Sequence, residues 1–260
     1  MVNLTRSRMY FPLNPHPAIL LTMSTLYMVA CPIGNLEDIT IRALKVLESV
    51  QVVACEDTRH TGILLNHYNL RKRTIACHAH NEVDSAKGII GLLDSGEDVA
   101  YLSDAGTPGI SDPGARLVEL VRSTTDHSIV PLPGASAASA LISVAGNVGK
   151  TFTFEGFLSP KKGRRTRRLE ELCSRGETFI VYESPFRVLK TLEDIRSVDP
   201  QCTVVMGREL TKQFEEIVSL PVSDLIALLG QRTPVRGEFA LAVIPSQGTC
   251  DDNNPEDQDA

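Results

Sequence analysis

From Leu26 onward, the chain alternates short apolar runs with longer amphipathic segments. In the first half, the apolar runs at residues 26–30, 52–55, 74–77, 99–102 and 129–132 predict strands. The segments between them predict helices near residues 39–49, 58–66, 82–94, 114–122 and 136–145. In the first helix, the apolar residues that recur every three positions are expected to share one face: Ile41, Leu44, Leu47 and Val50. Such alternation predicts a mostly parallel sheet covered by helices on both faces.

The pattern restarts after residues 146–151, which we interpret as a linker. Beyond it, we expect strands near 152–155, 178–182, 202–206 and 238–244, and helices near 166–174, 185–196 and 222–229. The sequence therefore predicts two α/β domains, at residues 25–148 and 149–246, that meet close to Lys150. Residues 1–24 are expected to be a disordered extension, with Met1 or Met23 as the true start. Residues 247–260 are expected to be a disordered acidic tail.

The composition, with 42% hydrophobic and 22% charged residues, is typical of a soluble globular protein. The six cysteines form no C-x-x-C pair, so we expect reduced thiols of a cytoplasmic protein rather than a metal site or disulfides. No apolar run is long enough to span a membrane. The formal net charge of −6 does not favour nucleic acid, so any such contact requires a local basic patch.

Unusual residues follow four of the predicted strands: the loops at 31–38, 103–114 and 131–139 contain glycine and proline, and residues 56–59 are Glu-Asp-Thr-Arg. In a parallel sheet such loops emerge at the carboxyl edge, where open α/β sheets bind ligands. The G-x-G-x-x-G fingerprint is absent, and the sequence before Gly149-Lys150-Thr151 does not match a P-loop. Small backbone-lined loops with one carboxylate, Asp104, suit a nucleoside with a cationic side chain better than a triphosphate. S-adenosylmethionine is such a ligand.

Five motifs resemble the tetrapyrrole methylases, and within them the branch that methylates small-subunit ribosomal RNA. They are VACPIGNLEDIT at 29–40, CEDTR at 55–59, HNE at 80–82, SDAGTPGISDPG at 103–114 and RELTK at 208–212. The resemblance covers residues 25–246 in order. It implies two α/β domains, the N-terminal sheet mostly parallel and the C-terminal sheet mixed, with S-adenosylmethionine in the cleft between them. It also implies a homodimer that 2′-O-methylates a cytidine in the decoding centre of 16S rRNA, in the small ribosomal subunit.

The resemblance implies cofactor-binding residues in both halves of the chain. From the first half they are Pro32, Gly34, Asn35, Asp104, Ala105, Gly106, Thr107, Pro108, Pro133, Gly134, Ala135 and Ser136. From the second half they are Tyr182, Glu238, Phe239 and Ala240. A simpler interpretation of Asp104 is that it caps the turn at Thr107. The chain departs from the family at Cys31, Phe186 and Arg236, where threonine, histidine and lysine are usual.

Methyl transfer to a ribose hydroxyl needs in-line positioning of the reacting atoms, and a base near the oxygen helps. The candidates for that base are Asp57, His80, Glu82, Glu183, Glu209 and Lys212, of which we name Asp57, His80 and Glu183 as catalytic candidates. The sequence does not choose among them. Asp57 could belong to an ordinary helix start, His80 could be structural, and Glu183 could be buried beside an arginine.

Six cations within eight residues mark the candidate RNA-binding surface: Lys161, Lys162, Arg164, Arg165, Arg167 and Arg168. Cations repel each other and are unfavourable at a helix N-terminus, so the cluster indicates an anionic partner such as rRNA. The alternative is a solvated helix start. Arg187, Arg208 and Lys212 are further candidates for phosphate contact, although each could form a surface salt bridge.

Two other functions stay open. A porphyrinoid methyltransferase would use the same fold, but the Ile33-Gly34-Asn35 loop lacks the Gly-x-Gly-x-Gly-Asp pattern typical of those enzymes. A non-catalytic RNA-binding assembly factor would not need the cofactor loops, which are intact here.

Overall fold

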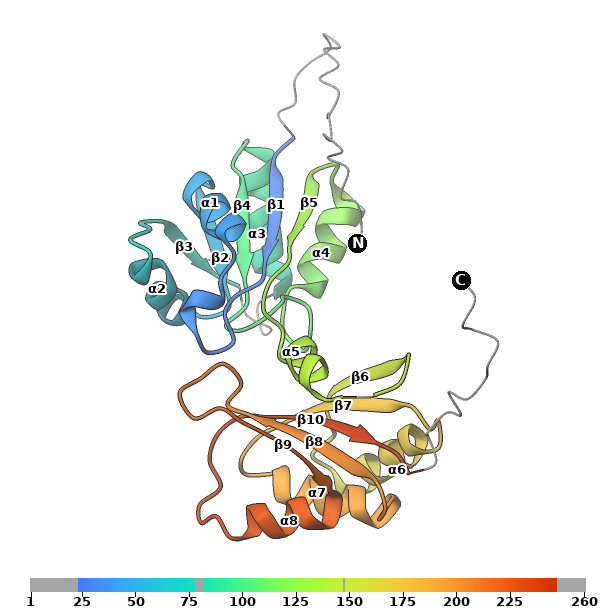
Figure 1. The fold of residues 1–260 in the computed structure, drawn as a ribbon. Helices are drawn as coiled ribbons and strands as arrows, with labels where there is room; N and C mark the ends of the chain where they lie inside the picture. The colour runs from blue at the N-terminus through green and yellow to red at the C-terminus, as the bar shows by residue number, and fades with distance from the viewer. Residues whose placement is uncertain (1–22, 78–81, 147, 247–260) are drawn as a thin grey trace, which may run out of the picture.

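The computed structural model describes residues 23–77, 82–146 and 148–246, which form two five-stranded sheets with their helices (Figure 1). The first half contains β1 (Thr25–Val29), η1 (Leu36–Asp38), α1 (Ile41–Ser49), β2 (Val52–Cys55), α2 (Thr58–His67), β3 (Arg73–Ala76), α3 (Glu82–Asp94), β4 (Val99–Leu102), α4 (Ala115–Thr124), β5 (Ser128–Leu132) and α5 (Ala137–Val144). The second half contains β6 (Phe152–Phe157), α6 (Lys162–Cys173), β7 (Thr178–Glu183), α7 (Val188–Val198), β8 (Thr203–Arg208), β9 (Glu216–Pro221), α8 (Val222–Gly230) and β10 (Phe239–Ile244). The predicted fold class, two α/β units, is confirmed.

The first sheet has the strand order β3-β2-β4-β1-β5, and its strands all pair in parallel. Successive side chains of a strand point to opposite faces. Val53 and Ala100 pack with residues of α1 and α2, whereas Val52 and Val99 pack with residues of α3 and α4. Burial on both faces explains why β2 and β4 are continuous apolar runs.

The second sheet is mixed, with the order β6-β7-β10-β8-β9. Strands β6 and β7 are parallel, and the other pairings are antiparallel. One face is covered by α6, α7 and α8 through Leu169, Leu192 and Leu225. The opposite face, which carries Ile180 and Val205, is covered in part by α5.

Helix α5 follows the last strand of the first sheet but packs on the second sheet, and Figure 1 shows it between the two halves. Its buried Ala138 and Leu141 belong to one apolar cluster with Ala240 and Ala242 of β10. Small residues on both elements allow this close packing. The predicted boundary between two domains near Lys150 stays a prediction, because α5 precedes this boundary but packs on the sheet that follows it.

Three local predictions were wrong. The sequence pattern missed β9, a strand at the sheet edge with alternating exposure. Helix α6 begins at Lys162, about one turn earlier than predicted. Ile41 is exposed, although Leu47 of the same helix is fully buried. A helix turns by about 100° per residue, so a step of three drifts, and Ile41 lies roughly 120° from Leu47 around the axis.

None of the helices in the described ranges has the length and apolarity needed to cross a membrane. The five cysteines that the structure describes are free. The predictions for the N-terminal extension up to residue 22 and for the acidic tail at 247–260 lie outside the described residues.

Candidate active site

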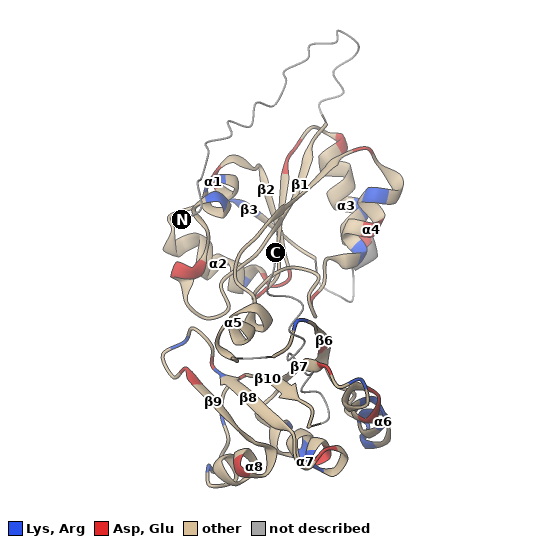
Figure 2. Cartoon of the chain, turned by 45° about the vertical axis from the view of Figure 1, so that its right-hand side comes forward, with Lys and Arg blue, Asp and Glu red and all other residues tan. Residues whose placement is uncertain are grey.

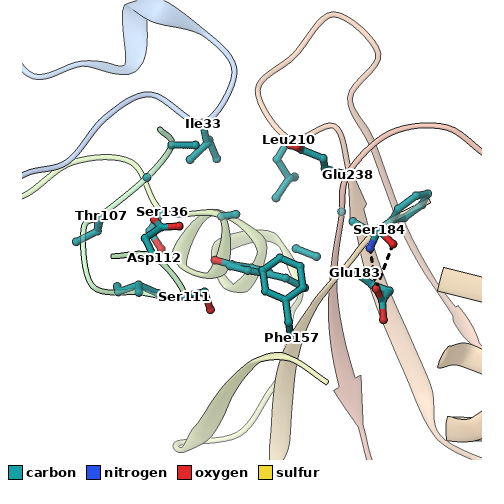
Figure 3. A pocket seen from close by; sticks show the side chains of 18 of the residues that line it. Ile33, Thr107, Ser111, Asp112, Ser136, Phe157, Glu183, Ser184, Leu210 and Glu238 are labelled. Atoms are coloured by element: carbon teal, nitrogen blue, oxygen red, sulfur yellow. Dashed lines mark hydrogen bonds between the residues drawn. The ribbon is translucent and has the colours of Figure 1, made fainter. Parts of the chain in front are cut away.

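A cleft of about 420 Å³ lies where the loops of the first sheet face the second sheet (Figure 3). Ile33, Thr107 and Ser136 lie on one side of it, and Leu210 and Glu238 on the other. Its lining residues are Ile33, Ala105, Gly106, Thr107, Ile110, Ser111, Asp112, Ser136, Ala137, Phe157, Tyr182, Glu183, Ser184, Pro185, Gly207, Leu210, Lys212, Glu238, Phe239 and Ala240. Small side chains predominate on the first-sheet side, so a ligand there can approach the backbone closely.

The loops after β1, β4 and β5 meet, as expected for strand ends at one sheet edge. The backbones of Cys31 and Gly106 exchange two hydrogen bonds, with N···O distances of 2.8 and 3.1 Å. The Thr107 hydroxyl donates to the carbonyl oxygen of Ala135 at 3.2 Å. These bonds join three loops that are far apart in the sequence into one wall of the cleft.

The predicted cofactor residues divide into two groups. Those that line the cleft are Ala105, Gly106, Thr107, Ser136, Tyr182, Glu238, Phe239 and Ala240. Those in the supporting turns, outside the lining, are Pro32, Gly34, Asn35, Asp104, Pro108, Pro133, Gly134 and Ala135. In the first supporting turn, the Asn35 amide donates to the Thr211 hydroxyl at 3.2 Å. A Cβ atom on Gly34 would lie 2.3 Å from Cγ of Lys212, so only glycine lets this turn pack on the β8–β9 loop.

The Asp104 carboxylate does not line the main cleft. It accepts a hydrogen bond from the Asp57 amide at 3.1 Å and borders a second hollow with Glu56, Thr58 and Arg59. Asp57, the predicted catalytic candidate, caps α2 and pairs with Arg59 at 2.7 Å. Hydrogen bonds from Arg59 hold the pKa of Asp57 well below its usual range, which makes this carboxylate a weak base.

The carboxylate that lines the cleft from the first sheet is Asp112, which the sequence reasoning missed. It follows Ser111, whose φ of 63° lies in the left-handed region, in the loop between β4 and α4. Burial, together with the charge of Glu56, raises the pKa of Asp112 to about 6. A raised carboxyl pKa in a cleft is typical of a functional group that accepts a proton near neutral pH.

Glu183 lines the cleft, but its carboxylate is engaged in the fold. It accepts hydrogen bonds from the Thr191 hydroxyl and the Ser184 amide, both at 2.8 Å, and pairs with Arg187 at 3.2 Å. Its side chain is almost fully buried. Buried acids need such partners, and this set of partners favours a structural role over that of a free base.

Lys212 joins two acids at the rim of the cleft. Its Nζ donates to Glu238 at 2.7 Å and to Glu209 at 3.1 Å. Burial alone would lower the pKa of Lys212, but the hydrogen bonds with Glu238 and Glu209 outweigh it and raise that pKa. Lys212 is therefore a cation and not a base at neutral pH.

The predicted basic cluster is only partly a free surface. Lys161, Lys162, Arg164 and Arg167 are exposed around the start of α6, where Figure 2 shows Lys and Arg side by side. Arg168 is held by Glu155 at 2.7 Å and by Glu171 at 2.9 Å. Most cations at the start of α6 therefore point to solvent, whereas Arg168 is neutralised by two acids.

Arg165 is a correction to the predicted RNA-binding set, because its side chain is only 2% exposed. Its Nε donates to Asp194 at 2.6 Å, so helical phase places this cation in the interior. Arg208 pairs with Glu216 at 2.9 Å, which is one of the salt bridges the sequence left open. Arg187, another residue predicted to contact phosphate, donates to the Leu158 carbonyl oxygen at 2.8 Å.

The side chains of two candidate bases are outside the part of the chain that the structure describes. His80 lies outside the described residues, and Glu82 begins α3 but its side chain is likewise outside them. Among the residues that are described, no group of three His, Cys, Asp or Glu side chains could hold a metal ion.

Comparison with known proteins agrees with this geometry. A structure of cobalt precorrin-4 methyltransferase, a cobalamin biosynthetic enzyme, has a TM-score of 0.64 at 18% identity and covers 89% of this chain and 98% of its own. The uroporphyrin III C-methyl transferase of Thermus thermophilus has a TM-score of 0.61 at 14% identity and covers 84% of this chain and 97% of its own. At these identities the likeness shows the fold alone.

Sequence relatives are much more similar. The ribosomal RNA small subunit methyltransferase I of Pasteurella multocida is 44% identical over 220 residues, which are 84% of this chain and 78% of that protein. The protein of the same name from Vibrio cholerae is 46% identical over 84% of this chain and 76% of its own. Residues 25–226 match the family of Tetrapyrrole (Corrin/Porphyrin) Methylases. The chain belongs to the tetrapyrrole methylase family.

Proposed function

We propose that this protein uses S-adenosylmethionine to methylate the ribose 2′-oxygen of a cytidine in the decoding centre of 16S rRNA. The names of its relatives support an rRNA substrate in the small subunit. The observation that carries the proposal is the cleft in which the loops after β1, β4 and β5 face the second sheet. We further propose a cytoplasmic location, from the rRNA methyltransferase relatives, and a homodimer, from the family resemblance.

The cleft fits S-adenosylmethionine in size and chemistry. About 420 Å³ is within the usual range of small-molecule sites. Gly106, Ser136 and Ala240 would hold the nucleoside against the backbone, and the carboxylates of Asp112 and Glu238 suit a cationic ligand. When bound, this cofactor supplies an activated methyl group.

The protein's own contribution is positioning and proton removal. Holding the hydroxyl in line with the methyl carbon supplies a large part of the rate gain. Asp112 is the group we assign to accept the hydroxyl proton at its carboxylate, because it lines the cleft and burial raises its pKa to about 6. Glu183 and Asp57 are less suited, since each carboxylate is already paired with an arginine.

The exposed cations at the start of α6 are the surface we assign to rRNA phosphates: Lys161, Lys162, Arg164 and Arg167. Lys and Arg contacts with phosphates supply affinity without reading sequence. The buried Arg165 contributes to the fold instead.

The experiment is methyl transfer from tritium-labelled cofactor to small ribosomal subunits isolated from a strain that lacks this activity. We expect label in 16S rRNA. Folded protein that binds the cofactor but labels no RNA, and instead labels a uroporphyrinogen, would replace the proposal with the porphyrinoid alternative. Protein that binds RNA but not the cofactor would favour the assembly-factor alternative.

A further inference from the structure

Strand β6 contains a bulge that changes the direction of its last side chain. Its register with β7 shifts between Phe154 and Gly156, so two residues of β6 oppose one residue of β7. Gly156 has a φ of 71°, and a Cβ atom there would lie 2.5 Å from the Ser111 hydroxyl oxygen. In a regular strand, Phe154 and Phe157 would point to opposite faces. The bulge brings both to the cleft side, as bulges near active sites commonly do.

The ring of Phe157 is held in place but remains open to solvent. It lies edge-on to the Tyr182 ring with centroids 5.8 Å apart, and Phe154 contacts the same tyrosine at 5.1 Å. Phe157 lines the cleft, yet its side chain is 58% exposed. Figure 3 shows the ring projecting into the cleft. A fixed, exposed aromatic face at a cleft is a surface for a flat apolar partner.

The segment that follows connects this ring to the basic helix. The Leu158 carbonyl accepts from Arg187 at 2.8 Å, and the Ser159 and Pro160 carbonyls accept from Arg165 at 3.1 and 3.2 Å. The buried pair of Arg165 with Asp194 anchors this arrangement. The exposed Lys161 and Lys162 therefore stand at a fixed position just after Phe157 in the chain.

We propose that Phe157 is the stacking surface for an unpaired nucleobase of the RNA, with Lys161 and Lys162 contacting the neighbouring phosphates. The inference rests on the proposed rRNA function and names its substrate subsite. Aromatic rings beside cations are the two components with which proteins bind single-stranded nucleic acid. A ribose within a paired helix is poorly accessible to a cleft, and unstacked bases are commonly held on aromatic side chains.

The adenine of the cofactor is the competing partner for this ring. The glycine- and alanine-rich loops suited to the cofactor, at Gly106 and Ser136, come from the first sheet, whereas Phe157 comes from the second. Phe157 also lies shortly before Lys161 and Lys162 in the chain. The positive charges of these lysines suit phosphates and not a cationic cofactor. These observations favour the RNA base.

The chain contains no tryptophan, so the fluorescence of one introduced tryptophan reports on that position alone. In Phe157→Trp, we expect an oligocytidylate to quench the tryptophan fluorescence. The same oligonucleotide annealed to oligoguanylate should cause no quenching. S-adenosylmethionine alone should also cause no quenching. The matched control is Phe152→Trp, on the same strand, 46% exposed and outside the cleft lining, which should show no quenching. Binding of labelled oligocytidylate is followed by anisotropy in the same samples. Quenching by the cofactor alone, or oligonucleotide binding without quenching at position 157, would overturn the proposal.

A kinetic test uses small ribosomal subunits, so it does not depend on the affinity of a short oligonucleotide. We expect Phe157→Ala to raise the KM for subunits about 5- to 150-fold, the range of one lost base–aromatic stack, and Phe157→Tyr to bring the KM most of the way back to the parent value. The dissociation constant of S-adenosylmethionine should stay unchanged. An active enzyme whose subunit KM is insensitive to Phe157→Ala overturns this inference alone, whereas parent enzyme that methylates no RNA overturns the proposed function.

Discussion

The Tyr182 hydroxyl accepts a hydrogen bond from the backbone amide of Ala138 at 2.9 Å. Ala138 belongs to the first turn of α5, and Ser136, at the N-cap of that helix, makes no side-chain capping bond. A strand of the second sheet thus caps the helix that leaves the first sheet. Because Ser136 and Tyr182 both line the cleft, this bond fixes the cleft wall as well as the helix.

Tyr182→Phe removes this cap and leaves the Ala138 amide without its acceptor. We expect the free energy of unfolding to fall by about 0.5–2 kcal/mol, the usual cost of a lost N-cap. Affinity for S-adenosylmethionine should fall with it. Denaturant unfolding and calorimetry measure the two effects, with Tyr27→Phe on β1 as the control. Equal stability of the variant and the parent would show that the bond does not hold the helix.

Asp112→Asn should change activity and stability in opposite directions. Loss of the proton acceptor should lower kcat by about 10²- to 10⁴-fold. In the parent, kcat/KM should decline as pH falls below about 6, because the carboxylate must be ionised to accept a proton. The exposed Asp126→Asn serves as the control for activity. A variant with near-normal kcat would remove Asp112 from the mechanism.

The stability effect follows from the same pKa. Folded Asp112 has a pKa of about 6 against a usual 3.8, so the folded state binds the proton more tightly than the unfolded chain does. Stability is therefore lost as pH rises from about 4 to 6. Above pH 6 the Asn variant should be more stable by about 1 kcal/mol, a value reduced for the partial exposure of the group. Below pH 4 the difference should vanish.

Gly34→Ala tests the contact between the first loop and the β8–β9 loop. The new Cβ atom would lie 2.3 Å from Cγ of Lys212 and 3.2 Å from the Leu210 carbonyl oxygen, so the two loops must separate. We expect weaker cofactor binding and a loss of about 1–3 kcal/mol in stability. Gly62→Ala in α2 is the matched control, because its Cβ would meet nothing within 4 Å, and it should stabilise the protein slightly. Equal behaviour of the two variants would contradict the interlocked loops.

Substitutions at Arg165 and at its exposed neighbours should affect different properties, stability in the first case and RNA binding in the second. Arg165→Ala leaves Asp194 buried without its partner and should cost about 3–5 kcal/mol of stability. Combined Lys161→Ala and Lys162→Ala should leave stability unchanged but weaken RNA binding, with a salt-dependence slope smaller by about 2. Thermal unfolding and binding at several salt concentrations measure both. An unchanged slope would exclude these lysines from the RNA-contact surface.

The sequence predicted the fold where burial imposes a simple pattern. Strands β2 and β4 are buried on both faces, so their continuous apolar runs predict strands directly. Strand β9 was missed because it lies at an edge, with Ile217 partly exposed and charged residues before it. Edge strands lack the continuous apolar run that marks a central strand.

The candidate site was predicted less completely, because side-chain direction depends on local backbone geometry. Asp104 lies two residues after the end of β4, where ligand-binding residues are expected. The carboxylate that lines the cleft is instead that of Asp112, after a turn with Ser111 in the left-handed region. Arg165 is one of six similar cations in sequence. Only its helical phase and its contact with the distant Asp194 distinguish it from the exposed Arg164.

The proposed reaction brings an activated methyl group from this cleft to a ribose hydroxyl of small-subunit rRNA. Its most direct test is mass spectrometry of the nucleosides released from 16S rRNA after small subunits react with the enzyme and isotopically labelled S-adenosylmethionine. We expect labelled 2′-O-methylcytidine with the parent enzyme and a large reduction with Asp112→Asn. Label on a base, or no labelled nucleoside despite cofactor binding, would contradict it.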